Sequence, residues 1–140
     1  MLRIGRQAYA EMISHCWDGY PLEACGLLGG ADADATLCYP TANDAQSARV
    51  YTVDPKGYLR ADRDAEGRGR SVIGAFHSHT HTVAYPSPTD VAQAPDPEWH
   101  YVIVSLADGL PVVRSYRIAD GKISEEPVTL MEASGREDLR

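Results

Sequence analysis

Apolar residues recur every three or four positions at the start of the chain, which is the spacing of one face of a helix. The residues of this stripe are Ile4, Ala8, Met12, Ile13, Cys16 and Trp17. The pattern predicts an amphipathic helix that ends at the Gly-Tyr-Pro turn of residues 19–21. Strands are expected next near residues 25–30, 36–41 and 49–53, and a polar helix between Pro55 and Arg70.

The second half of the chain predicts further strands with one short helix between them. Residues 71–76 form an apolar, β-branched run that indicates a buried strand with His77 at its end. Ser87 is a good N-cap and Pro88 suits the first turn of a short helix that continues to residue 94. Residues 99–106 predict a long strand, and two more strands are expected around the Asp-Gly turn at residues 120–121.

This order of elements predicts an α/β fold in which a mixed central β-sheet is flanked by helices. A chain of 140 residues is expected to form a single domain, here residues 1–131. The polar tail, residues 132–140, is expected to be frayed.

Composition limits the classes of function. The net charge of −7 disfavours nonspecific binding to nucleic acid. No segment approaches the run of about 18 apolar residues that a membrane span needs. The N-terminus lacks the apolar region of a signal peptide, which favours a cytoplasmic protein, and the odd number of cysteines, 3, favours reduced thiols.

The sequence His77-Ser78-His79, followed after seven residues by Ser87 and then Asp90, has the spacing of a catalytic zinc site. Residues i and i+2 of a strand share a face, so the two imidazoles can point to one cation. Ser87 and Asp90 alone are also close to a helix capping box that involves no metal. Both interpretations can hold together, with Ser87 capping the helix and Asp90 binding the cation. A water molecule would then be the fourth ligand of a single Zn²⁺ ion.

A carboxylate is also needed near such a cation, to accept a proton from water and pass it to a leaving amine. Glu23 is the candidate, because it lies between the end of the first helix and the start of a strand. The alternative is a solvated turn carboxylate. The remaining histidines, His15, His81 and His100, are expected to be structural or loop residues, although His81 could also contact metal or substrate.

These positions resemble the signature of the JAMM metalloproteases, also called MPN+ or Mov34-type domains. The matching residues are Glu23, His77, His79, Ser87 and Asp90. The opening Pro-x-Glu-x-Cys-Gly-Leu-Leu-Gly and the late strands at 101–105 and 114–118 are similar to the compact bacterial branch. Residues 84–91 and 118–128 further resemble peptidases that release cysteine from a ubiquitin-like sulfur-carrier protein.

The resemblance implies a single JAMM/MPN-type domain with a cytidine-deaminase-like fold. It implies that His77, His79 and Asp90 bind zinc, that Glu23 is the acid/base, and that Ser87 donates a hydrogen bond to the oxyanion. The implied activity is hydrolysis of the amide after the C-terminal Gly-Gly of a ubiquitin-like sulfur carrier, with release of cysteine for biosynthesis. A zinc hydrolase of small-molecule amides and a noncatalytic scaffold remain as alternatives, and the oligomeric state, including a homodimer, stays open.

Overall fold

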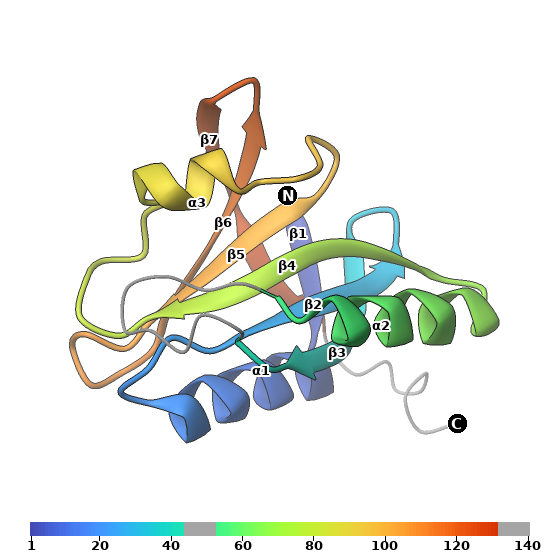
Figure 1. Ribbon diagram of the computed structural model, residues 1–140, viewed down its shortest axis with the longest axis horizontal. Coiled ribbons are helices and arrows are strands. Elements are labelled where there is room, and N and C mark those ends of the chain that lie inside the picture. The colour runs from blue at the N-terminus through green and yellow to red at the C-terminus, as the bar shows by residue number, and fades with distance from the viewer. Residues whose placement is uncertain (44–52, 132–140) are drawn as a thin grey trace.

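The computed structural model describes residues 1–43 and 53–131. A mixed 8-stranded sheet with the order β7-β6-β5-β4-β2-β3-β1-β8 forms its centre (Figure 1). The strands are β1 (Leu2–Gly5), β2 (Cys25–Ala31), β3 (Asp34–Thr41), β4 (Ser71–His79), β5 (His100–Ser105), β6 (Val112–Ala119), β7 (Lys122–Glu126) and β8 (Val128–Met131). The helices are α1 (Arg6–Gly19), α2 (Pro55–Gly67) and α3 (Pro88–Ala92).

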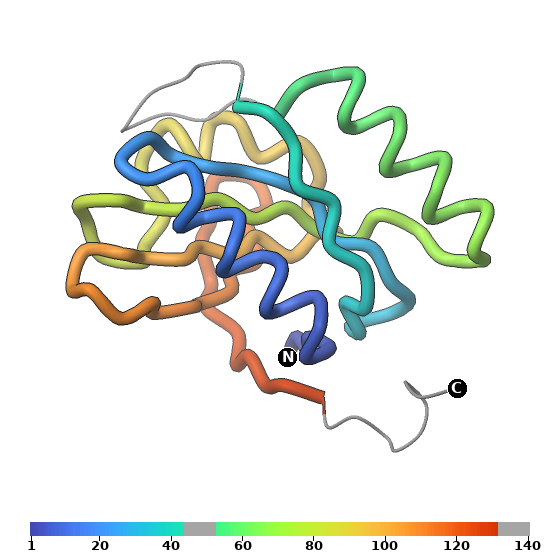
Figure 2. The backbone as a smooth tube through the Cα atoms, turned by 90° about the horizontal axis from the view of Figure 1, so that it is seen from below, coloured from blue at the N-terminus to red at the C-terminus, as the bar shows by residue number. Residues whose placement is uncertain are grey.

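The helices cover both faces of the sheet. Helix α1 packs its buried residues Ala8, Met12 and Cys16 in one core cluster with Phe76 and Val102. In Figure 2, which shows the molecule from below, α1 (blue) crosses the near side of the sheet. A second cluster lies on the other face, where α2 and α3 cover a different set of strand residues. Those strand residues include Leu27, Ala75, Tyr101 and Ile103. Side chains point alternately to the two faces along each strand, so the same strands contribute residues to both cores.

The predicted α/β class with a mixed sheet flanked by helices is confirmed, while several element bounds differ. The strand predicted at 49–53 falls outside the described residues except for Val53. Val53 forms an isolated bridge to Asn43. Two short strands, β1 and β8, were not predicted; they pair in parallel with each other, and β8 forms one edge of the sheet. Four-residue strands carry too little alternation for sequence patterning, and the helical stripe had absorbed Ile4.

Strand β4 and its connection to β5 determine where the site lies. Because β4 pairs antiparallel with β2 and parallel with β5, the chain must leave the end of β4 and cross over through α3. The strand continues beyond the predicted bound and carries both His77 and His79. None of the helices in the described ranges has the length and apolarity needed to cross a bilayer.

The loop between β4 and α3 is fixed by bonds from neighbouring strands. The Ser105 hydroxyl donates to the Thr82 carbonyl at 2.6 Å, and the Tyr116 hydroxyl donates to the Ala84 carbonyl. Tyr85 adds an edge-on ring contact with Tyr116, at a centroid distance of 5.6 Å. These bonds hold the start of α3 against the end of β4.

Candidate metal centre and active site

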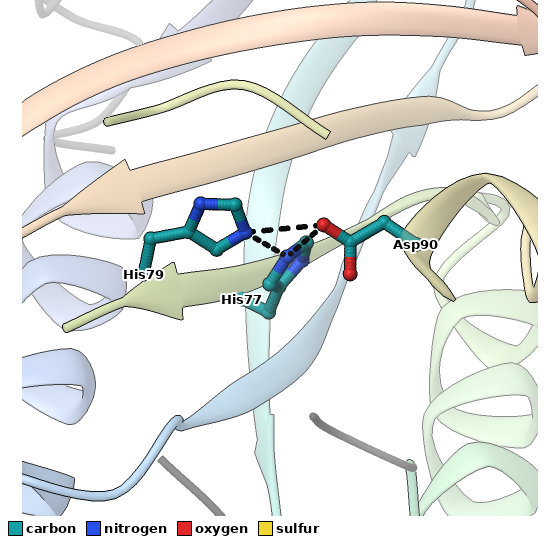
Figure 3. Close-up of side chains that lie close together, drawn as sticks. All are labelled: His77, His79 and Asp90. Carbon is teal, nitrogen blue, oxygen red and sulfur yellow. Dashed lines mark hydrogen bonds and ion pairs between the residues drawn. The ribbon is translucent and has the colours of Figure 1, made fainter. Parts of the chain in front are cut away.

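Three ligand-type atoms converge at the end of β4. His77 Nε2 lies 3.1 Å from His79 Nε2 and 3.2 Å from Asp90 Oδ2, and His79 Nε2 lies 3.1 Å from the same oxygen. Figure 3 shows both imidazoles rising from the strand toward the carboxylate, which comes from α3. All three residues are buried. The sequence motif is therefore assembled in space from two separate elements.

The spacing of these atoms suits a zinc ion. Zinc ligands at about 2.05 Å in a tetrahedral arrangement are about 3.3 Å apart, close to the separations of 3.1 and 3.2 Å between these three atoms. Two imidazoles and one carboxylate are also a donor set that zinc accepts. Three protein ligands leave one coordination position for a water molecule or a substrate. The residues therefore fit a catalytic type of metal site.

Hydrogen bonds orient the ligands for this task. The Nδ1–H of His79 donates to the Val83 carbonyl at 2.8 Å, which leaves the Nε2 lone pair for a cation. Burial lowers the pKa of His79, but the bonds to Asp90 and Val83 outweigh burial, so its pKa is raised. Burial lowers the pKa of His77 and prevails there. Burial acts to raise the pKa of the Asp90 carboxyl, yet hydrogen bonds to the two imidazoles hold that pKa well below its usual range.

Ser87 and Asp90 form a capping box, so the helix-capping interpretation is confirmed. The Asp90 N–H donates to Ser87 Oγ at 3.1 Å, and the Ser87 N–H donates to Asp90 Oδ2 at 2.9 Å. The same carboxylate oxygen thus receives a backbone bond and faces both histidines. Because the Ser87 hydroxyl uses a lone pair in the cap, its O–H remains a donor. One short segment therefore both starts α3 and positions a ligand-type carboxylate.

Glu23 lies just before β2 and is not a solvated turn residue. Its side chain is only 5% exposed, and its Oε1 atom is buried without a hydrogen-bond partner among the described residues. Burial raises the pKa of Glu23 to about 8. The charge of His79 acts to lower this pKa, and the charge of Asp90 acts to raise it. These mutual effects place the carboxyl within electrostatic reach of the ligand cluster. A buried, unpartnered carboxyl beside convergent ligands is typical of a catalytic group.

An apolar pocket of about 670 Å³ lies on the same face of the sheet. Its lining residues are Leu27, Val53, Pro55, Tyr58, Ala75, Gln93, Pro95, Asp96 and Trp99. Ala75 precedes His77 by two positions on β4, and Gln93 follows Asp90 by one helical turn. The pocket therefore adjoins the ligand cluster from both β4 and α3. Sequence patterning could not find it, because the lining residues come from separate segments.

The other histidines have structural surroundings. His15 lies within 3.0 Å of the Cys25 carbonyl and 3.2 Å of the Thr41 carbonyl. His100 pairs with the Glu126 carboxylate at 2.7 Å. His81 is exposed in the loop after β4, with its ring 6.0 Å from that of Tyr20. These surroundings agree with the prediction that His15 and His100 are structural. His81 does lie in a loop, and a contact of His81 with metal or substrate stays a prediction.

Comparisons with known proteins agree with this geometry. The sequence model for prokaryotic homologues of the JAB domain matches residues 5–119. A CysO-cysteine peptidase of Mycobacterium tuberculosis is 40% identical over 124 residues, which cover 86% of this chain and 85% of that protein. A desampylase of Haloferax volcanii is 34% identical over 112 residues, covering 74% and 80%. The solution structure of DSY2949 from Desulfitobacterium hafniense has a TM-score of 0.87 at 36% identity and covers 98% of this chain and 97% of its own.

Proposed function

Because the chain belongs to the family of prokaryotic homologues of the JAB domain, we propose that it is a zinc-dependent peptidase acting on a ubiquitin-like sulfur-carrier protein. The bond cleaved is the amide after the carrier's C-terminal Gly-Gly, and the released group is cysteine, for use in cysteine biosynthesis. The observation that carries the proposal is the convergence of His77, His79 and Asp90 within 3.2 Å. Beside them lies the buried Glu23, whose Oε1 has no hydrogen-bond partner among the described residues.

In this proposal His77, His79 and Asp90 hold the cation through the three atoms that already converge. When bound, zinc polarises the scissile carbonyl and lowers the pKa of a coordinated water to about 7. The protein's own part is to hold the ligand atoms in place and to keep the imidazoles in the right tautomer. The bond from His79 Nδ1 to the Val83 carbonyl does this for one of them.

Glu23 is the acid/base of the proposed reaction. It takes a proton from the attacking water and returns it to the nitrogen of the leaving amine. Burial raises the pKa of this carboxyl to about 8, whereas positive charge at the ligand cluster lowers it again. The two effects together keep a proton-accepting and a proton-donating form within reach near neutral pH.

Ser87 stabilises the oxygen that gains charge, and the apolar pocket binds the tail of the carrier. The Ser87 hydroxyl donates to the oxygen that gains negative charge, a contribution worth about 3 kcal/mol for one well-placed donor. The pocket beside β4 gives the carrier's tail an apolar surface as it approaches in an extended form. Two glycines before the cleaved bond carry no side chains and let that backbone pass close to the ligand cluster.

The relatives support this assignment over the alternatives. One of them is a peptidase by name and another is a desampylase, and the match covers most of the length of both. A noncatalytic scaffold would not need three convergent ligand atoms together with a buried carboxyl of raised pKa. A small-amide hydrolase would share the same chemistry and differ only in substrate, so substrate cleavage is the deciding measurement. A cytoplasmic location and a possible homodimer remain predictions.

The test is intact mass spectrometry of a ubiquitin-like carrier that ends in Gly-Gly-Cys, incubated with the zinc-loaded protein. We expect the carrier to lose the mass of one cysteinyl residue. Chelator-treated protein and the Glu23→Ala variant serve as controls, and both should leave the carrier intact. Cleavage in the Glu23→Ala reaction at the normal rate would remove Glu23 from the mechanism. An intact carrier after incubation with zinc-loaded wild-type protein would reject the proposed substrate.

A further inference from the structure

The peptide bond that follows Glu23 is held on both sides by side chains. Its carbonyl, that of Glu23, accepts a hydrogen bond from Asn43 Nδ2 at 2.8 Å. Its N–H, that of Ala24, donates to Ser78 Oγ at 2.9 Å. Ordinary strand pairing of β2 begins only at Cys25. Side chains therefore replace the sheet ladder at the peptide between Glu23 and Ala24.

Holding both polar groups of a peptide fixes its plane, because the unit is planar. The plane in turn fixes one backbone torsion of Glu23 and one of Ala24, and so sets the direction in which the Glu23 side chain leaves the chain. This matters because Glu23 Oε1 has no hydrogen-bond partner among the described residues. The side chain lacks its own anchor on that atom, and the backbone supplies the orientation.

We propose that Asn43 and Ser78 are positioning residues that set the place of Glu23 relative to the metal ligands. The inference rests on the proposed role of Glu23 as acid/base. Ser78 is fully buried and stands between His77 and His79 on β4, with its side chain on the opposite face. Its own N–H also donates to the Ala24 carbonyl at 2.9 Å. The strand that carries two ligand histidines is therefore hydrogen-bonded to the segment that carries Glu23.

Asn43 links the same peptide to the substrate side. It forms an isolated antiparallel bridge with Val53, and Val53 lines the apolar pocket. The Glu23 carbonyl is thus joined through one amide side chain to a wall of the pocket. We call Asn43 and Ser78 the clamp. Because both act through the peptide that orients Glu23, the clamp should affect turnover more than binding.

The experiment compares Ser78→Ala and Asn43→Asp with wild type on the Gly-Gly-Cys carrier. Asn43→Asp keeps the side-chain shape but sets an acceptor against the Glu23 carbonyl. Each variant should lose about 10- to 100-fold in kcat, the cost of a misplacement near 1 Å, with KM and zinc content unchanged. Ser78→Thr keeps the hydroxyl and should restore turnover. Ser71→Ala, at the exposed start of the same strand, is the matched control and should behave as wild type.

Two further measurements separate positioning from a general structural role. The Ala24 amide should exchange its hydrogen faster in Ser78→Ala, as followed by NMR on the zinc-loaded protein. In a Glu23→Gln background, adding Ser78→Ala or Asn43→Asp should leave the residual rate unchanged, because both residues act through Glu23. A loss in that background as large as in wild type would overturn the inference.

The same set distinguishes the inference from the proposed function. If Glu23→Gln abolishes turnover while both clamp variants keep wild-type kcat, the positioning role is wrong and the acid/base role stands. If Glu23→Gln itself turns over normally, the acid/base role fails first. Loss of zinc from either clamp variant would show that the residue supports the ligands and not the base, which also overturns the inference.

Discussion

Two buried histidine–carboxylate groups lie on opposite faces of the same sheet and differ in how well their polar atoms are matched. One is the ligand cluster of His77, His79 and Asp90. The other joins His100 of β5 to Glu126 of β7, with Ser115 of β6 between them. His100 pairs with Gly74, three positions before His77, so the side chains of the two histidines project from opposite faces.

In the His100 group the Glu126 carboxylate faces donors. Its Oε1 atom has no hydrogen bond among the described residues, but the terminal ammonium of Met1 lies 3.3 Å from it. The Ser115 hydroxyl and His100 Nδ1 both reach Glu126 Oε2 at 2.7 Å. In the ligand cluster two imidazole nitrogens face each other at 3.1 Å, and a buried carboxyl oxygen of Glu23 has no hydrogen-bond partner within the described segments. A matched buried network contributes stability, whereas an unmatched one is costly unless a ligand completes it. The two groups therefore differ in their surroundings: the Glu126 carboxylate faces donors and an ammonium, whereas the ligand-type nitrogens of His77 and His79 face each other.

The largest difference is expected when one histidine of each group is removed. His77→Ala should weaken zinc affinity by more than about 100-fold, the upper end of the cost of losing a supporting residue outside the ligand shell, and turnover should vanish with the metal. His100→Ala should keep both and lose only stability. Elemental analysis after dialysis against a weak chelator measures the metal. Equal zinc in the two variants would refute the ligand role of His77.

Replacing the glutamate of each group by glutamine should give opposite phenotypes. Glu23→Gln should keep zinc and lose kcat by about 100-fold or more, because a general base is removed. Glu126→Gln should keep kcat and lose about 2 kcal/mol of stability, because buried bonds to a charged acceptor are weakened. Steady-state kinetics and urea unfolding of both proteins make the test. A slow Glu126→Gln enzyme that retains its stability would contradict the division between the two groups.

The ligand cluster was predictable from the sequence because its chemistry is local. Two histidines two positions apart on a strand share a face, and a Ser-x-x-Asp cap places its acid in the first turn of the next helix. Both rules depend on neighbouring residues alone. The mixed sheet followed in the same way from the order of apolar segments. Glu23 was a candidate because it lies between the first helix and a strand, and the family resemblance implied its acid/base role. No local rule separated it from a solvated turn carboxylate.

The remaining features depend on contacts between distant segments. The clamp joins Glu23 to Asn43 and Ser78, which are separated from the clamped peptide by 20 and 54 positions. Strands β1 and β8 pair with each other although they lie at opposite ends of the described chain, and each is too short to show its period. Such pairings are tertiary, so patterns read within a window of the sequence cannot reveal them.

Replacing the serine of each group, Ser87 or Ser115, should give a smaller contrast. Ser87→Ala should lower kcat by about 100-fold through the lost oxyanion donor and stability by about 1 kcal/mol through the lost cap. Ser115→Ala should cost a similar amount of stability with kcat unchanged. Ser87→Thr, which keeps both the cap and the hydroxyl, is the control. Normal kcat in Ser87→Ala, together with a lowered melting temperature, would leave Ser87 with its capping role alone.

The smallest effect is a difference in how stability depends on pH in chelator-treated protein. Burial raises the pKa of Glu23 to about 8, so the folded state binds more protons than the unfolded state from about pH 4.3 upward, and stability falls as pH rises through this window. Burial also acts upward on Glu126, but the bonds from His100 and Ser115 prevail and lower its pKa to about 2. That stabilisation is complete above about pH 4.3 and is lost as pH falls toward 2.

Urea unfolding of wild type, Glu23→Gln and Glu126→Gln between about pH 3 and pH 9 separates the two contributions. The advantage of wild type over Glu126→Gln should shrink toward acid, because protonation removes the charge that His100 and Ser115 stabilise. Relative to Glu23→Gln, wild type should instead become less stable toward alkaline pH, because ionisation leaves a buried charge without a partner. Two differences with the same slope would mean that both carboxyls have similar surroundings, and the contrast between the two faces of the sheet would fail.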